Sequence, residues 1–163
     1  MPKILIFAPC EKVIVSEEDK TTSLISLIEG FTIGIPEGTE VPEEATIPIK
    51  WHVLTIWEKI EGEDEKRFEQ RIELVLPDGK KPLDEATAID FKPEPKRFRQ
   101  VSMIIGFPIS PSGSVMLKLS LKEVGQSDWQ EVAEYAIFIT RPQATAEEGV
   151  TNEEPKPENA EVG

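Results

Sequence analysis

Apolar and polar residues alternate with a period of two through most of the first 140 residues, and this alternation constrains the fold more than any other feature. It is clearest in residues 47–57, 68–76, 115–121 and 133–139. Successive side chains of a β-strand point to opposite faces, so each run predicts a strand with one buried face. The best helical window, Ser16–Leu27, has only a candidate cap and an acidic first turn in its favour. The sequence therefore predicts an all-β chain.

The expected core faces follow from the same alternation. We expect inward side chains from every strand, and in 47–57 the residues Leu54 and Ile56 make the second half apolar on both faces. The inward residues predicted for five strands are Ile47, Ile49, Trp51, Val53 and Trp57; Phe68, Ile72, Leu74 and Leu76; Val101, Met103, Ile105 and Phe107; Val115, Leu117, Leu119 and Leu121; and Ala133, Tyr135, Ile137 and Ile139.

Turn chemistry divides the remaining chain. The charged loop 61–66 predicts a hairpin between strands 47–57 and 68–76, and Pro77–Lys80 and Gly125–Asp128 predict two further turns. A shorter strand with Thr87, Ile89 and Phe91 inward is expected before a Pro-rich connector at 92–95. Residues 4–8 and 13–15 resemble short strands buried on both sides. Residues 21–28 resemble another strand, with 31–35 as a candidate continuation.

Eight or nine strands spaced by about ten residues are typical of a sandwich or a barrel. Unequal strand lengths favour a mainly antiparallel two-sheet sandwich, immunoglobulin-like in general architecture. We expect this domain to span residues 1–141. Residues 142–163 are rich in Pro and Glu and contain no aromatic residue. Such a segment cannot bury enough apolar surface to offset its ordering entropy, so we predict a disordered acidic tail.

The formal net charge is −13, from 31 acidic and 18 basic residues. Nucleic-acid phosphates and anionic membrane surfaces repel such a chain, so neither is an expected partner. A basic protein or a divalent cation would suit the charge, although net charge often serves solubility alone. Cys10 is the only cysteine, and the apolar run at 4–8 is too short for a signal peptide. We therefore expect a cytoplasmic protein.

Catalytic and metal-binding patterns are weak. His52, the only histidine, could act as a base for Cys10, but we expect a solvent-facing histidine and a small buried cysteine instead. Zinc patterns need more ligands than the chain contains, and phosphate-binding and hydrolase motifs are missing. Two acidic loops could hold catalytic carboxylates or Ca²⁺, but solvated loop tips are the simpler interpretation. No cofactor is expected. The acidic loop residues are Glu17, Glu18 and Asp19, and Glu61, Glu63, Asp64 and Glu65.

One basic cluster contrasts with the acidic background. It could bind an anion or an acidic partner, although a solvated strand entry paired with nearby acids would have the same composition. Its residues are Lys92, Lys96, Arg97 and Arg99, with Phe91 and Phe98 beside them. Of the tryptophans, Trp51 shares a core face, whereas Trp129 follows a turn and is the best candidate for an exposed carbohydrate platform.

Six segments carry a resemblance to a known family. They are Cys10–Val15, Ser23–Gly30, Ile47–Trp51, Leu76–Gly79, Gly106–Ile109 and Glu134–Ile137. Together they resemble a family of small, uncharacterised bacterial β-sandwich proteins, a domain of unknown function. The resemblance covers most of residues 5–140. It implies a fold and assigns no activity or site, because the matching segments are turns and core strands.

The sequence leaves three functions open. The leading hypothesis is a non-enzymatic protein-interaction or structural module that uses a sheet edge or the loops at one end, with another subunit or itself as partner. The alternative is a small-ligand or carbohydrate-binding domain. A hydrolase that uses Cys10 with His52, or a pair of loop carboxylates, is the least favoured.

Overall fold

The computed structural model describes residues 1–35, 39–42, 45–62, 66–90 and 96–142. These residues contain nine strands and no helix, so none of them forms an apolar helix long enough to span a membrane. Residues 143–163 of the predicted tail lie outside the described residues, as do Phe91 and Lys92. The strands are β1 (Lys3–Val15), β2 (Thr22–Leu27), β3 (Gly30–Thr32), β4 (Thr46–Glu58), β5 (Arg67–Val75), β6 (Leu83–Asp90), β7 (Arg97–Pro108), β8 (Gly113–Glu123) and β9 (Gln130–Thr140).

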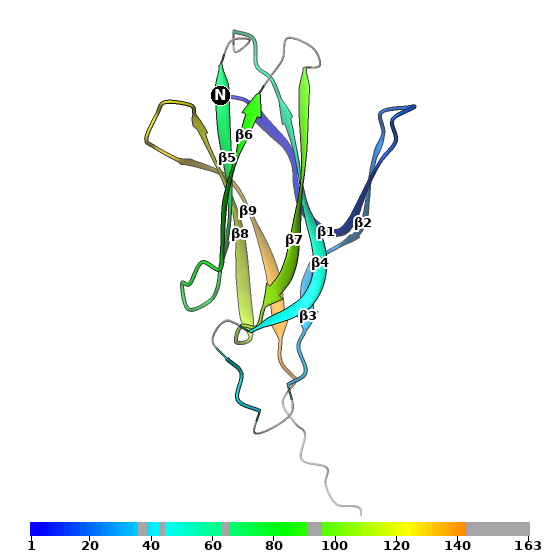
Figure 1. Ribbon diagram of the computed structural model, residues 1–163, viewed down its shortest axis with the longest axis vertical. Coiled ribbons are helices and arrows are strands. Elements are labelled where there is room, and N and C mark those ends of the chain that lie inside the picture. Colours follow the sequence, from blue (N-terminus) through cyan, green and yellow to red (C-terminus); the bar gives the residue numbers. More distant parts are fainter. Residues whose placement is uncertain (36–38, 43–44, 63–65, 91–95, 143–163) are drawn as a thin grey trace, which may run out of the picture.

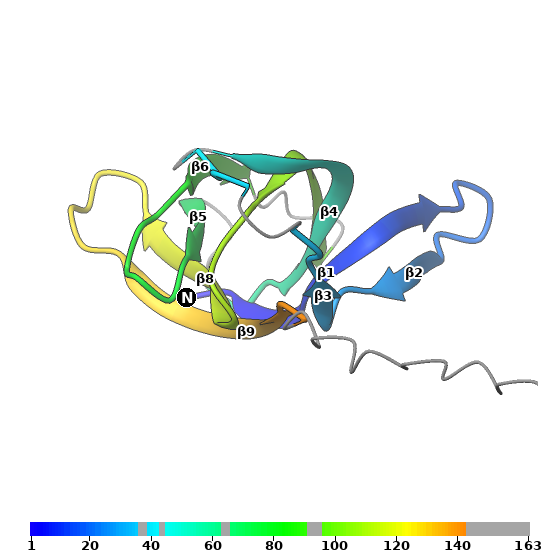
Figure 2. The same ribbon diagram turned by 90° about the horizontal axis from the view of Figure 1, so that it is seen from below.

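The strands form two sheets, which confirms the predicted all-β two-sheet architecture (Figure 1). Sheet A has the strand order β2-β1-β4-β7 and is antiparallel throughout. Sheet B has the order β3-β9-β8-β5-β6 and is mixed, because β3 runs parallel to β9. Viewed from below, the strands of the two sheets curve around a common interior. The second half of β1 extends away from this interior together with β2 (Figure 2).

Two connections differ from the prediction. β5–β6 and β8–β9 are antiparallel neighbours, as expected, but β4 and β5 belong to different sheets and do not form a hairpin. Residues 31–35 do not extend β2 either, because Gly30–Thr32 crosses to sheet B. Glycine permits this crossing: a Cβ at Gly30 would lie 2.5 Å from the Phe138 carbonyl oxygen. Alternation shows that a strand exists, but it does not say which sheet the strand joins.

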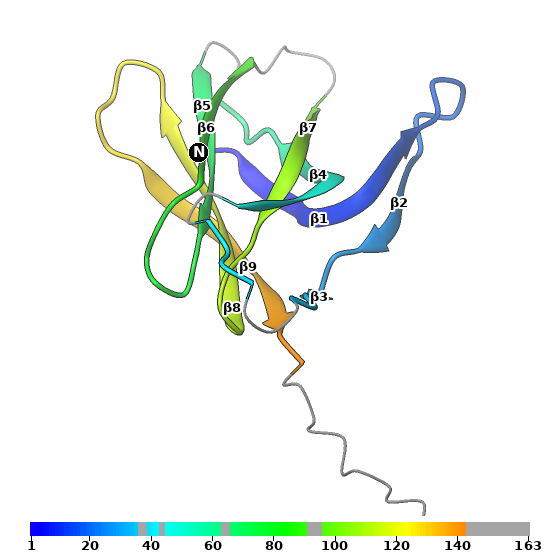
Figure 3. The same cartoon turned by 60° about the horizontal axis from the view of Figure 1, so that its bottom comes forward.

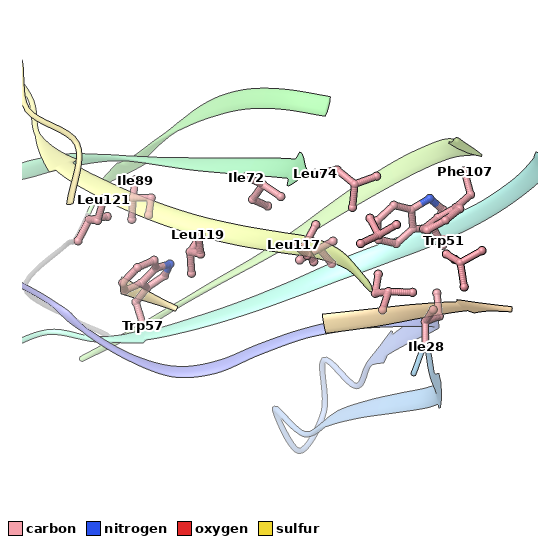
Figure 4. Close-up of a cluster of buried hydrophobic side chains, with 14 of the residues drawn as sticks. Ile28, Trp51, Trp57, Ile72, Leu74, Ile89, Phe107, Leu117, Leu119 and Leu121 are labelled. Atoms are coloured by element: carbon pink, nitrogen blue, oxygen red, sulfur yellow. The ribbon is translucent and has the colours of Figure 1, made fainter. Parts of the chain in front are cut away.

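The core lies between the inner faces of the two sheets (Figure 4). Side chains of β4, β5 and β8 fill it with the predicted residues, and Trp57, Leu117 and Leu119 are fully buried. One polar group joins the sheets inside this apolar layer. The Oε1 atom of Gln70 on β5 accepts hydrogen bonds from Trp57 Nε1 at 2.9 Å and from Thr55 Oγ1 at 3.0 Å, both on β4. At this point the two sheets are therefore held together by hydrogen bonds of defined geometry as well as by apolar contacts.

The predicted inward face of β7 is wrong for three of its four residues, since Val101 pairs with Leu54 and lies on the same outward face as Met103 and Ile105. Phe107 is buried, but Met103 is 52% exposed and Ile105 is 77% exposed. The alternation changes phase at Gly106, which has a φ of +87° and lies beside a bulge in β4. A bulge of one residue reverses the faces of every side chain beyond it. Phe98, Ile104 and Phe107 therefore contact the core, and Met103 and Ile105 point outward.

Residues 4–8 and 13–15 form one continuous strand rather than two strands buried on both faces. β1 pairs with β4 only as far as Cys10, and then continues with β2 as a two-stranded arm (Figure 3). We call Glu11–Leu27 the arm. At its base Ser26 adopts a φ of +53°, a left-handed conformation that is uncommon for a residue other than glycine. Ile6 (37%) and Ile14 (44%) are exposed, contrary to the prediction.

The arm bends back toward the opposite edge of sheet A. Arg99 Nη1 on β7 donates a hydrogen bond of 2.6 Å to Thr22 Oγ1 on β2, although these are the two edge strands. In a flat sheet, edge strands separated by three spacings would lie about 14 Å apart. The arm, which lies beyond the pairing of β1 with β4, is therefore bent out of the plane of sheet A toward the side on which Arg99 lies.

Candidate functional site

Ion pairs between neighbouring strands cover much of the outer face of sheet B, although Phe138 on β9 is 59% exposed. Lys122 binds Glu69 at 2.9 Å and Lys118 binds Glu131 at 2.8 Å. Glu73 is only 4% exposed and accepts a hydrogen bond of 2.7 Å from Lys81. That bond, assisted by the Arg71 charge, keeps the pKa of Glu73 below its ordinary value although burial acts in the opposite direction. This face is typical of a surface that meets solvent.

Trp129 lies on the same side and is half-buried by the chain's own cations. The Arg71 guanidinium lies 4.7 Å from the ring centroid, and Lys122 Nζ lies 4.8 Å from it. These cation–π contacts stabilise the ring where a sugar would have to stack. Trp51 and Trp57 belong to the core, with exposed fractions of 1% and 0%. The described structure therefore offers no open tryptophan platform.

The outer face of sheet A has the opposite character, and we call it the apolar face. Its centre is fully buried or nearly so although it lies outside the core cluster, and it consists of Ala8, Cys10 and Leu54. Around the centre lie Ile6, Ile25, Leu27, Ile56, Val101, Met103 and Ile105. One row of cross-strand neighbours, Leu27, Cys10, His52 and Met103, runs through all four strands. Apart from His52, apolar residues therefore continue across the whole face.

Cations surround this apolar centre. Cross-strand partners of the apolar residues place Lys12 beside Ile25, Lys50 beside Ile105 and Arg99 beside Ile56. At one end of the face Arg97 lies 3.6 Å from Glu58, the acid opposite Lys3. Neither Lys12 nor Lys50 forms an ion pair within the described part of the chain. Acids outnumber bases in the whole sequence, so this is a local reversal of charge.

The predicted basic cluster contributes to this face only in part. Arg97 and Arg99 begin β7 and are exposed, and Lys96 is exposed just before it. Arg99 bonds to the arm and Arg97 pairs with Glu58, so the two cations are partly engaged. Lys92 lies outside the described residues. Lys12 and Lys50, which the sequence did not single out, join the cluster only because β1, β4 and β7 are neighbours.

A pocket of about 450 Å³ lies where β1 separates from β4. Its walls include Leu27, Ile28, Phe31, Ile49 and Trp51, with the polar residues Glu11, Ser26 and Lys50 also lining it. Pairing of β1 with β4 stops at Cys10 and His52, so the fork between the arm and β4 is not closed by a strand. Leu27 and Lys50 line both the pocket and the apolar face, which makes the two surfaces continuous.

Cys10 and His52 are direct cross-strand partners, a proximity that their spacing in the sequence did not indicate. Cys10 is fully buried, and burial raises the pKa of its thiol, which opposes formation of the nucleophilic thiolate. His52 Nδ1 donates a hydrogen bond of 2.8 Å to the Glu11 carbonyl oxygen, which orients the ring. This arrangement matches the expected buried cysteine and provides poor conditions for a thiol nucleophile.

The acidic loops gather no metal site within the described residues. In the arm turn, hydrogen bonds from Ser16 and Thr21 lower the pKa of Asp19 to about 2. The Asp19 carboxylate accepts hydrogen bonds within its own turn, from Thr21 Oγ1 at 2.8 Å and from the Thr21 backbone nitrogen at 3.1 Å. Glu63, Asp64 and Glu65 lie outside the described residues, so the second loop remains a prediction.

The sequence contained an indication of the apolar face, namely strands that are apolar on both sides, which an analysis of alternation does not detect. Leu54 and Ile56 marked β4 as apolar on both faces, and Ile104 and Ile105 are adjacent in β7. A strand with two apolar faces inside a two-layer protein has an outward face that solvent does not favour.

No protein-family model matches the chain, and a search of curated proteins finds no significant match. The resemblance to uncharacterised bacterial β-sandwich proteins therefore stays a prediction.

Proposed function

We propose that the chain is a non-enzymatic protein-interaction module that binds its partner through the apolar face. The observation that carries this proposal is the contrast between the two outer faces. Cross-strand ion pairs line much of sheet B, where Phe138 is the only large apolar side chain among the described residues that is more than half exposed, whereas on sheet A Leu27, Met103 and Ile105 all are. Contiguous apolar surface beside cations is typical of binding sites, since solvent alone would favour polar residues there.

The arm supports the same proposal. It is a two-stranded ribbon with apolar residues on both sides, Val13 and Leu24 on one and Ile14 and Ile25 on the other. An isolated two-stranded hairpin has little stability in water. A partner that covers the arm and the apolar face would bury these residues. The single reduced cysteine is compatible with the cytoplasm as the place where this happens.

Ile105→Glu tests the proposal. Ile105 is 77% exposed, so the substitution should leave the melting temperature almost unchanged while placing a charge within the contact. Pull-downs from native lysate with the wild-type chain should retain a partner that the variant loses. Val124→Glu, in the β8–β9 turn and 43% exposed, is the matched control and should retain it. Equal retention by Ile105→Glu and the wild type would contradict the proposal.

The fork pocket supports a second candidate function, the binding of a small apolar ligand. Its volume and its mixture of apolar walls with a few polar groups are typical of ligand sites. Since Trp51 lines the pocket, titration with fatty acids, indole and monosaccharides should change the tryptophan emission saturably. Ile49→Phe, which reduces the pocket, should remove the response. An unchanged emission across the whole panel would exclude this function for those ligand classes.

A further inference from the structure

We infer that the partner is an extended polypeptide segment, apolar in its middle and acidic at its ends, which adds as a strand to the free edge of β7. This inference rests on the proposed function and names the chemistry of the partner. It combines three observations: an unpaired edge, an apolar row beside it, and cations at both ends of that row.

The unpaired edge belongs to β7. β7 pairs with β4 alone in the described structure, so the main-chain groups on its other side have no strand partner. Exposed edges are usually protected by charge or proline, as Asp84 and Glu85 do in the edge strand β6. Residues 100–107 of β7 contain neither a charged residue nor a proline. An incoming strand could therefore bond to this stretch, the mode of recognition known as β-augmentation.

The side chains beside that edge select for apolar neighbours. Val101, Met103 and Ile105 alternate along the outward face of β7, and the last two are more than half exposed. Directly opposite residues on paired strands have Cβ atoms about 5 Å apart, so every second side chain of an added strand would contact this row. Apolar side chains at those positions would bury surface that is now in water.

The charges select for acidic ends. Arg97 and Arg99 lie at the start of β7, and Lys50 is the cross-strand partner of Ile105 near its end. Lys50 lies on β4, across β7 from the free edge, so a carboxylate at that end of the segment would approach it over the outward face past Ile105. A carboxylate at the other end would approach Arg97 or Arg99. The same charges disfavour a second copy of this chain docked face to face, because both copies would bring the same cations, Lys50 and Arg99, into one interface.

A labelled synthetic peptide tests the inference on the full chain. The peptide has about ten residues, with alternating valine and threonine in the middle and two glutamates at each end. Fluorescence anisotropy should show saturable binding that weakens with added salt. The same peptide with lysines at its ends should bind at least about fivefold more weakly, since two exposed ion pairs are replaced by repulsion.

Three variants locate the binding. Lys50→Glu and Ile105→Glu should each weaken the acidic peptide at least about fivefold, whereas Lys80→Glu, with the same change in net charge on the β5–β6 turn, should not. Absence of binding by the acidic peptide, or equal binding of acidic and basic peptides, would overturn the inference. If lysate capture still depended on Ile105, the proposed function would stand and only the partner chemistry would be wrong. A concentration-dependent dimer in light scattering that Ile105→Glu abolishes would instead assign the face to a second copy.

Discussion

Leu119→Asp should leave the chain unfolded under conditions in which the wild type is folded. Leu119 lies at the middle of β8 and has no exposed surface. Its neighbours on the inner faces are apolar, so an aspartate there would be an unpaired buried charge or would have to take up a proton. Either costs several kcal/mol, a large part of the roughly 5–15 kcal/mol by which a domain is usually stable. Far-ultraviolet circular dichroism and thermal melting measure this directly.

Leu27→Asp is the matched control, because it makes the same substitution at a leucine that is 52% exposed on β2. We expect it to change the free energy of unfolding by less than about 1 kcal/mol. A Leu119→Asp chain that melts with the wild type would show that the inner face of β8 has been assigned wrongly, and with it the packing of sheet B on sheet A.

Trp57→Ala should destabilise the domain by about 3–5 kcal/mol, the usual cost of removing a large buried aromatic side chain. Trp57 has no exposed surface, and its indole nitrogen donates to Gln70 across the two sheets. The substitution leaves a cavity and removes one of the two hydrogen bonds that Gln70 Oε1 accepts. Urea denaturation followed by circular dichroism gives the free energy of unfolding.

Two variants separate these contributions. Trp57→Phe keeps most of the volume and loses the indole hydrogen bond, so we expect a smaller loss of about 1–2 kcal/mol, in addition to any cost of imperfect packing. Trp129→Ala removes the half-buried tryptophan on the outer face of sheet B. It should lower the free energy of unfolding by about 1 kcal/mol, chiefly through the loss of the contacts with Arg71 and Lys122. If the alanine substitutions at 57 and 129 had equal effects, Trp57 would not be a core residue.

Sheet B was largely predictable because its strands have one apolar and one polar face. Val115, Leu117, Leu119 and Leu121 are buried as predicted, and Lys118 and Lys122 on the other face form ion pairs. Short turns joined β5 to β6 and β8 to β9, so local chemistry also indicated the pairing. In such strands the pattern of a few residues carries most of the information about burial.

Sheet A was predicted less well because its strands are apolar on both faces. In β7, the adjacent residues Ile104 and Ile105 allow two opposite assignments of the inner face, and the positive φ at Gly106 decides between them. In β1, the apolar run suggested burial on both sides, whereas its second half leaves the sheet as the arm. The candidate site lies in these ambiguous strands, which explains why only Arg97 and Arg99 of the predicted cluster belong to it.

By itself the sequence determined that the chain is all-β, where most of its strands lie, and which side chains of sheet B are inside. Each of these depends on alternation within a single strand, a local property. Only the tertiary structure decided that β4 and β5 join different sheets, that Cys10 and His52 are neighbours, and that Met103 and Ile105 face outward beside Lys50. These features depend on pairing between strands far apart in the chain and on a bulge that reverses the faces of a strand, and local alternation records neither.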